Sequence, residues 1–328
     1  LVAANKHQLL AASGGLIDVN MSGQVTTPLG VISAASIAEA RVLLNRMSAL
    51  PAGDARGKLT ENYLRLVPQK VSIAEGRGFA PHWLDRLTSV AKQQTLLDGL
   101  EASVSFASAA RKNAAQSSMD PSEHEDLFRY RVRALDGNDP DFAMVAERYT
   151  STKQDVHSWA RDLKVARVFA LSDARHETEI RSTAERVRNV RRLWHGTGAA
   201  NVLSILQKGL FVPPARGSGI HIAGRMFGDG IYLSRSSSKS LGYATGNWGG
   251  DRSGSTFMFL TRTAMGSEYR PGAGYDAGIP SKARTELNKF GKPFNSINVE
   301  AGMGGVRNHE AIVWDPMQVE LAYLVEFA

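Results

Sequence analysis

The stretch RRLWHGTGAANVLSILQKGL, residues 191–210, places a histidine between a short apolar run and a helical pattern. The apolar run predicts a strand that ends at His195, and the spacing of apolar residues after it predicts a helix. A lone histidine at a strand end is more often a structural residue than a catalytic one. Its role therefore depends on which other residues the fold brings to it.

The segments around this stretch are typical of an α+β domain. Glycine is concentrated in residues 196–274, which indicates long loops of the kind that carry functional residues. Short runs rich in β-branched or aromatic residues, each bounded by Gly, Pro, Asn or Asp, predict strands. They are KVARVFALS (164–172), GIYLS (230–234), STFMFLTRT (255–263), HEAIVWDP (309–316) and LAYLVEFA (321–328).

The first 135 residues predict helices and no strand. SIAEARVLLNRMSAL, residues 36–50, has Ser36 followed three positions later by Glu39, a reciprocal capping pattern at a helix start. DPSEHEDLFRYRVRAL, residues 120–135, begins in the same way at Asp120, and residues 82–110 form another periodic run. The expected apolar face comprises Ala40, Leu43, Leu44, Met47 and Leu50, and Met47, Trp83 and Phe106 are expected in the core rather than at a cofactor.

Composition limits the class of protein. The 328 residues are 43% hydrophobic and 22% charged, which is typical of a globular chain of about two domains. No apolar run approaches the roughly 18 residues of a membrane helix. The absence of cysteine excludes disulfides, thiolate zinc sites and cysteine nucleophiles. The chain starts at Leu1 without a signal-peptide pattern, so we expect it to be a fragment of a longer protein.

The net charge of +7 favours acidic partners such as nucleic acid or a phosphate-bearing ligand. The charge is densest in RSTAERVRNVRR, residues 181–192, where five arginines accompany Glu185. A solvated face beside a strand explains this run better than a DNA site.

Two further segments contain candidate site residues. In GRMFGDGIYLSRSSSKSLGYATG, residues 224–246, the glycines precede a strand, whereas a phosphate-binding loop leads from a strand into a helix. Tyr232 and Tyr243 in this segment are either a core pair or two rings that sandwich a planar ligand. Glu310 heads an apolar strand, and a buried carboxylate needs a hydrogen-bonding partner, which a ligand hydroxyl could supply.

These motifs together resemble the catalytic domain of poly(ADP-ribose) polymerases, the diphtheria-toxin-like ADP-ribosyltransferases. The resemblance rests on LWHGT with NVLSILQKGL, on MFGDGIYLSRSSSKSLGYA and on NHEAIVWDPMQVELAYLVEF, in that order. TTPLGVISAASIAEA, NYLRLVPQK and RYTSTKQDVH resemble the helical regulatory domain of the same enzymes. The resemblance implies a helical regulatory domain over 1–137 and, over 138–328, a mixed catalytic domain built on antiparallel sheets.

The resemblance implies a site that binds NAD+ as a substrate and needs no metal. His195, Tyr232 and Glu310 match the family's triad, in which the histidine binds the 2′-hydroxyl of the adenosine ribose. The main chain of Gly196 and the side chain of Ser240 would hold the nicotinamide amide. The other matched residues are Tyr232 and Tyr243 stacking on nicotinamide, Thr197 and Asn201 on the adenosine side, Pro213 to Gly224 as a closing loop, and Lys239, Met226 and Arg225 on the acceptor side.

The implied reaction breaks the nicotinamide–ribose bond through an oxocarbenium-like sugar that the Glu310 carboxylate stabilises. Glutamate at this position accompanies chain elongation in the family, so we expect a poly(ADP-ribosyl)transferase that modifies proteins and itself. Arg225 replaces a family tyrosine, Phe211 replaces an arginine, and the loop before Glu310 is short. The alternatives are a mono-ADP-ribosyltransferase acting on protein or nucleic-acid ends, a non-catalytic NAD-binding module, and a DNA-binding protein.

The helical half is expected to restrain the NAD site, so that deleting residues 1–135 raises activity; the alternative is a cap that only stabilises the catalytic domain. In the resembling enzymes, modules that bind DNA breaks relieve this restraint, and here they would precede Leu1. That implies a role in the DNA damage response. We expect an intracellular protein, nuclear if eukaryotic and cytoplasmic if bacterial or viral.

Overall fold

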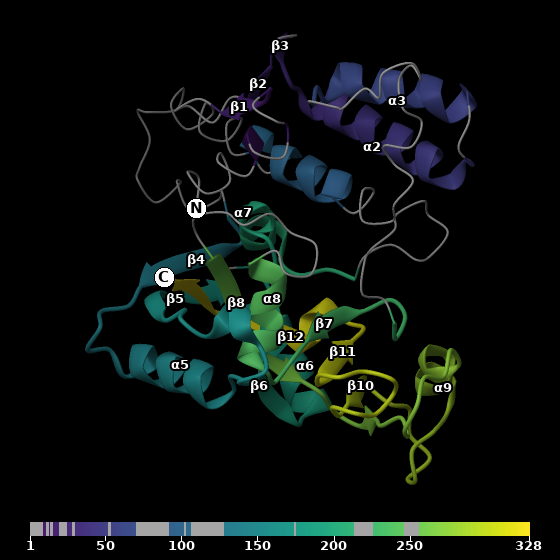
Figure 1. Cartoon of the computed structure of the whole chain (residues 1–328). Helices are drawn as coiled ribbons and strands as arrows, with labels where there is room; N and C mark the ends of the chain where they lie inside the picture. The colour runs from purple at the N-terminus through teal and green to yellow at the C-terminus, as the bar shows by residue number, and fades with distance from the viewer. Residues whose placement is uncertain are drawn as a thin grey trace. The chain divides into compact units, whose positions relative to one another are not determined.

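A computed structural model of the chain describes residues 9–10, 13, 16–19, 25–27, 30–51, 54–69, 92–101, 103–105, 128–173, 175–212, 226–245 and 256–328. The chain forms two compact units (Figure 1). The helical unit comprises Leu1–Leu127, Ala199–Gln207 and Pro214–Ala223; the sheet unit comprises Phe128–Gly198, Lys208–Pro213 and Gly224–Ala328. No helix among the described residues has the length and apolar composition needed to cross a membrane.

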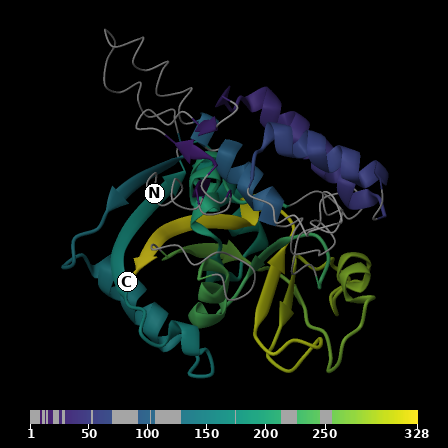
Figure 2. The same ribbon diagram turned by 45° about the horizontal axis from the view of Figure 1, so that its top comes forward.

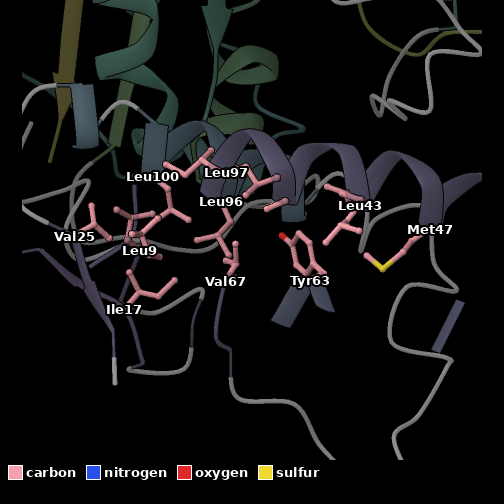
Figure 3. Packing of buried hydrophobic residues seen from close by; sticks show 14 residues of the cluster. Leu9, Ile17, Val25, Leu43, Met47, Tyr63, Val67, Leu96, Leu97 and Leu100 are labelled. Atoms are coloured by element: carbon pink, nitrogen blue, oxygen red, sulfur yellow. The ribbon is translucent and has the colours of Figure 1, made fainter. Parts of the chain in front are cut away.

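The helical unit contains helices α2 (Ala34–Ala49) and α3 (Asp54–Leu66) and a further helical segment over 92–101 and 103–105. Their apolar faces meet in one core, in which Leu43 and Met47 lie near Tyr63 (Figure 3). Burial of Ala40, Leu43, Leu44 and Met47 confirms the predicted helix face. Trp83 and Phe106 lie outside the described residues.

Two details of the predicted helix over residues 36–50 differ from the structure. The N-cap of α2 is Ser33, whose side chain accepts a hydrogen bond from the Ser36 amide at 3.0 Å, so Ser36 is not the cap. The helix begins earlier because two alanines, which have the highest helix propensity, follow Ser33. Leu50 follows the helix and is 37% exposed, so it does not belong to the buried face.

The prediction that this half has no strands is wrong. A small antiparallel sheet joins β1 (Asp18–Val19), β2 (Val25–Thr27) and β3 (Gly30–Val31). β4 (Tyr130–Ala134) occupies residues that were expected to be helical. It pairs with β5 (Val165–Asp173) from Tyr130↔Asp173 to Ala134↔Phe169, because the hydrogen bonds offered by a neighbouring strand outweigh a local helical pattern. The boundary between residues 137 and 138 stays a prediction, and β4 lies on its N-terminal side.

The described residues of the sheet unit form two sheets, as expected for an α+β domain. The larger sheet is antiparallel throughout and has the order β4-β5-β12-β8-β6; its remaining strands are β6 (Val190–Gly196), β8 (Thr256–Ala264) and β12 (Val319–Phe327). Figure 2 shows the C-terminal end of β12 beside β5. The smaller sheet has the order β7-β11-β10-β9, with β7 (Ile231–Leu233), β9 (Glu268–Tyr269), β10 (Ser296–Val299) and β11 (Glu310–Val313). All six strands predicted for this half are confirmed, including the one that carries His195.

Helices complete the sheet unit and cover its core. Trp194 of β6 is fully buried, and its ring meets that of Tyr149 edge-on at 6.3 Å. Leu241 of α8 is buried in the same cluster. The helical elements of this unit are α5 (Pro140–Ser151), η3 (Ser158–Ala160), α6 (Glu177–Val187), α8 (Ser237–Ala244), α9 (Ile279–Thr285) and η4 (Pro316–Gln318).

Candidate active site

The two sheets meet where the predicted site residues lie. Trp194 and Ser234 exchange both backbone hydrogen bonds, at 2.8 and 2.9 Å, and so join β6 to the end of β7. β7 pairs in turn with β11, where Tyr232 lies opposite Ile312. The end of β6, the middle of β7 and the start of β11 therefore converge, although they are distant in the chain.

His195 is oriented by the backbone of Tyr232. Its Nδ1 lies 3.0 Å from the Tyr232 carbonyl oxygen, an acceptor that requires Nδ1 to carry the proton. Burial lowers the pKa of His195, and the positive charge of Lys239 lowers it further, while the bond to Tyr232 opposes them. The imidazole is thus neutral near pH 7, and its Nε2 lone pair can accept a hydrogen bond from a hydroxyl.

Glu310 forms a buried ion pair with Lys239 of α8. Lys239 Nζ lies 2.6 Å from Glu310 Oε2, and the two side chains are only 6% and 14% exposed. Burial raises the pKa of Glu310, and the ammonium of Lys239 partly offsets this shift. The pair places a carboxylate with restricted access to water at the junction of the two sheets.

Tyr243 lies beside this ion pair. Lys239 Nζ is 5.3 Å from the centroid of the Tyr243 ring, within the range of a cation–π contact. Burial and the negative charge of Glu310 raise the pKa of Tyr243 to about 12. Tyr243 is therefore a neutral phenol whose ring lies next to the carboxylate.

The contact between β6 and α8 requires glycine at position 196. A β-carbon on Gly196 would lie 1.7 Å from the carbonyl oxygen of Ser240 and 2.5 Å from its carbonyl carbon. Ser240 Oγ also donates to the Trp194 carbonyl at 3.2 Å, which keeps the helix against the strand. The backbone of Gly196 therefore lies directly against the backbone of Ser240.

The Tyr232 side chain supports a neighbouring turn. Its hydroxyl accepts from the Phe227 amide at 2.9 Å and donates to the Gly228 carbonyl at 2.8 Å. Gly228 has a φ of 80°, a conformation that favours glycine. The turn that carries Met226 is therefore held by a residue of the predicted triad.

The remaining predicted residues are less closely tied to this junction. Thr197 follows β6 and is 9% exposed, whereas Asn201 lies on α7 (Ala199–Lys208), which groups largely with the helical unit. Phe211 is 55% exposed. Arg225 and the loop from Pro213 to Gly224 lie outside the described residues.

His309 is a structural partner of this site that the sequence interpretation missed. Its Nδ1 accepts from the Arg235 amide at 3.0 Å, and its Nε2 donates to Asn298 Oδ1 at 2.8 Å. Asn298 Nδ2 donates to Glu268 Oε2, also at 2.8 Å. The Ser234 hydroxyl donates to the carbonyl of His309 at 2.7 Å. The sequence did offer a signal for this role, because His309 stands at the start of a strand predicted to be buried.

This chain of hydrogen bonds links the start of β11 to the residue preceding the α8 cap. Ser236 caps α8 by accepting from the Lys239 amide at 3.2 Å. Because His309 holds Arg235 and directly precedes Glu310, it helps to set the distance between the two members of the ion pair. His309 lies among positively charged side chains. Burial, followed by the charges of Arg235, Lys239 and Arg191, lowers the pKa of His309 to about 3.

The neutral state of His309 predicts an acid sensitivity of the fold. In the unfolded chain its pKa returns to 6.5, so below that pH the unfolded state binds a proton that the folded state excludes. Stability supplied by the neutral imidazole is complete above pH 6.5 and is lost as the pH falls towards 3. We expect the free energy of unfolding to fall by about 2 kcal/mol more in the parent than in His309→Gln between pH 7 and 5.

Urea unfolding of both proteins at the two pH values measures this difference. Burial also lowers the pKa of His195 and His157, but both histidines are present in both proteins and their contributions cancel. Equal acid sensitivity of the two proteins would show that His309 is not held neutral in the fold.

Among the described ranges, no group of three or more His, Asp or Glu side chains has an arrangement that could hold a metal ion. A cavity of about 210 Å³ lies beside α5 and β6 and contains none of the triad residues. It is lined by Met144, Glu147, Arg148, Ser151 and Arg192.

Comparisons with known proteins agree with this geometry. The family model described as the poly(ADP-ribose) polymerase catalytic domain matches residues 139–328. The chain is 24% identical to a poly [ADP-ribose] polymerase of Drosophila melanogaster over 90% of its own length and 31% of that protein. It is 24% identical to poly [ADP-ribose] polymerase 2 of Arabidopsis thaliana over 91% of its length and 49% of that protein. It is 30% identical to the protein mono-ADP-ribosyltransferase PARP3 of Mus musculus over 49% of its length and 29% of that protein.

The chain thus spans between about a third and a half of the first two relatives. The family model covers more than half of the chain, and all three strands that meet at the site lie within the match. The chain therefore belongs to the poly(ADP-ribose) polymerase family and contains its catalytic domain, an NAD+-dependent ADP-ribosyltransferase domain.

Proposed function

We propose that this protein is a poly(ADP-ribosyl)transferase that cleaves the nicotinamide–ribose bond of NAD+ and transfers ADP-ribose to proteins, itself included, and to growing chains. The observation that carries the proposal is the buried Glu310 carboxylate, held 2.6 Å from Lys239 where the strands of His195 and Tyr232 meet. A carboxylate in such a place stabilises a cationic sugar more strongly than one in water. The same group can orient the hydroxyl that attacks the sugar.

The residues around Glu310 have complementary roles in this proposal. The neutral imidazole of His195 accepts a hydrogen bond from the adenosine ribose through Nε2. The main chain of Gly196 and the hydroxyl of Ser240 hold the nicotinamide amide, and Tyr243 offers its ring to the nicotinamide face. The ring of Tyr232 also stacks on the nicotinamide in this proposal, and its hydroxyl supports the turn that carries Met226.

The reaction needs no reactant other than NAD+ and the acceptor. The bond between ribose C1′ and the nicotinamide nitrogen breaks, and its electron pair leaves with nicotinamide. A bond forms between C1′ and the acceptor oxygen, whose proton passes to Glu310 and then to solvent. Glu310 must be ionised to oppose the positive charge on C1′, so its raised pKa implies that activity is lost on acidification at a higher pH than for an ordinary glutamate.

Product length tests the proposal. Incubation with labelled NAD+ is expected to give a ladder of products on the protein. A single added unit would favour mono-ADP-ribosylation, the activity named for the mouse relative, whereas no nicotinamide release would favour a non-catalytic NAD-binding module. Offering nucleic-acid ends as acceptors tests the remaining alternative, a mono-ADP-ribosyltransferase that acts on nucleic acid.

We also propose that the helical unit restrains this activity and that DNA breaks relieve it through modules outside this chain. Deleting residues 1–135 tests the restraint poorly, because it also removes β4. That deletion takes away the ladder to β5 and the Arg129–Asp173 ion pair, in which Arg129 Nη2 lies 2.5 Å from Asp173 Oδ2. An intracellular location and a role in the DNA damage response stay predictions.

A variant of the full chain gives a cleaner test of the restraint. Leu44→Ala removes a side chain that is 1% exposed in the core of the helical unit, at an expected cost of about 2–5 kcal/mol to that unit. We expect nicotinamide release to rise by about fivefold or more, since coupling between sites is typically 1–3 kcal/mol. Val42→Ala changes an exposed side chain of the same helix and serves as the control. Unchanged turnover in a partly unfolded helical unit would support a cap that only stabilises.

A further inference from the structure

A small cavity beside α5 and β6 brings together basic side chains that the proposed reaction does not use. Its volume is about 210 Å³, and its lining comprises Met144, Glu147, Arg148, Ser151 and Arg192, none of which is an expected NAD+-binding residue. Pockets for drug-sized ligands usually have volumes of about 300–1,000 Å³. The cavity therefore has room for a small ion but not for a dinucleotide.

Arg148 is held at this cavity with part of its hydrogen-bonding capacity unused. Its Nη2 donates to the Arg192 carbonyl at 2.8 Å, which fixes the guanidinium against β6. Its Nε is buried and has no hydrogen-bond partner among the residues that the structure describes. A buried donor without an acceptor costs free energy, so a ligand oxygen that reaches this N–H group is stabilised there.

Positive charges gather around the Arg148 guanidinium. Burial lowers the pKa of Arg148, and the charges of Arg192 and Arg235 lower it further. Arg235 has a carboxylate partner in Glu300, and Glu147 is the acidic member of the cavity lining. Both Arg192 and Glu147 are exposed to solvent. An anion bound between the two arginines of the cavity relieves their repulsion, whereas Glu147 opposes its binding.

The elements that carry the two arginines are fixed to each other by hydrogen bonds at the end of α5. The Ser237 hydroxyl donates to the Tyr149 carbonyl at 2.7 Å, and the Ser237 amide donates to the Thr152 carbonyl at 3.2 Å. Thr152 Oγ1 accepts from Trp194 Nε1 of β6 at 3.1 Å. The cavity is therefore formed before a ligand arrives, and binding does not have to order its backbone.

We propose that this cavity binds a small anion of the phosphate class, inorganic phosphate or pyrophosphate, through Arg148 and Arg192. Guanidinium groups bind phosphate oxygens through charge-assisted hydrogen bonds, often in pairs. The oxygens of a tetrahedral phosphate point in several directions and serve two guanidinium groups at once, whereas a carboxylate has only two oxygens in one plane. The site is additional to the NAD+ site and does not depend on the proposed polymerase function.

The test is calorimetric titration of the full chain with sodium phosphate and with sodium pyrophosphate, at an ionic strength kept constant with sodium chloride. We expect Arg192→Gln to raise the Kd of the anion by at least about fivefold, because a hydrogen bond to a charged group is lost. Glu147→Gln removes a repelling charge and should lower the Kd by about two- to fivefold. Arg148→Lys keeps the charge but loses the Nε donor, so it should also weaken binding. Arg186→Gln, which removes an exposed arginine of α6, is the matched control for net charge and should bind like the parent.

The KM for NAD+ separates this site from the NAD+ site, where a phosphate could also bind. Arg192→Gln should leave that KM unchanged while it weakens anion binding. Equal Kd values for Arg192→Gln and the parent, or no binding of either anion by the parent, would overturn the inference. It would also fail if Arg186→Gln weakened binding as much as Arg192→Gln, since the protein would then respond only to net charge. Arg192 and Glu147 are exposed, so these outcomes remain measurable even if Arg148→Lys unfolds.

Discussion

Glu310→Gln is expected to lower the rate of ADP-ribose transfer by about 10²–10³, the usual effect of removing one group that stabilises transition-state charge. The amide keeps the shape of the side chain but cannot oppose the positive charge that develops on the ribose. Its oxygen can still accept from Lys239 Nζ, which lies 2.6 Å from Glu310 Oε2 in the parent. The fold should therefore survive while catalysis is lost.

Labelled NAD+ with products resolved by size measures this effect, and the denaturation midpoint tests the fold. Glu300→Gln is the matched control, because Glu300 also pairs with a basic side chain, that of Arg235, but is itself 44% exposed. We expect the control to transfer and elongate like the parent. Indistinguishable labelling by Glu310→Gln and the parent would remove Glu310 from the mechanism.

Gly196→Ala is expected to damage both the fold and NAD+ binding. The new methyl group would lie 1.7 Å from the Ser240 carbonyl oxygen, an atom of the helix backbone that cannot rotate away. Overpacking of this kind commonly costs about 1–3 kcal/mol, and we expect the upper end of the range because both contacting segments are backbone. A displacement of about 1 Å at the site would lower turnover by about 10².

Gly137→Ala provides the comparison, since a β-carbon at Gly137 would have no atom within 4 Å. We expect this control to retain the unfolding midpoint and the activity of the parent. Should Gly196→Ala unfold entirely, a second variant, Ser240→Ala, tests the same junction more mildly. It introduces no clash but removes the hydrogen bond to Trp194 and the hydroxyl proposed to hold the nicotinamide amide. A parent-like midpoint and KM for Gly196→Ala would contradict the close approach of β6 and α8.

Much of the sheet unit was predictable from the sequence. Its strands are marked by local composition, and the order of the motifs around His195, Tyr232 and Glu310 sufficed to recognise the family. These signals are local, because each depends on residues that are neighbours in the chain. The predicted apolar face of α2 was confirmed at Leu44 and Met47 for the same reason.

Other features depended on partners that are distant in the chain. β4 is a strand because β5 lies beside it, although its own residues continue a helical pattern. The start of α2 at Ser33 was missed because Ser36 and Glu39 match a capping pattern in the sequence, whereas in the structure the Ser36 amide donates to the Ser33 side chain. The bonds of His309 to Arg235 and Asn298 depend on the register of β11 against its neighbours, which nothing in the order of residues specifies.

By itself, the sequence determined the strands that carry the predicted site residues and the family to which the chain belongs. Only the tertiary structure decided that Lys239 pairs with Glu310, 71 positions away, and that Gly196 lies against the backbone of Ser240. The physical reason is that ion pairs and close packing depend on distances in space. Those distances follow from how the two sheets are joined, at Trp194 and Ser234, and not from spacing along the chain.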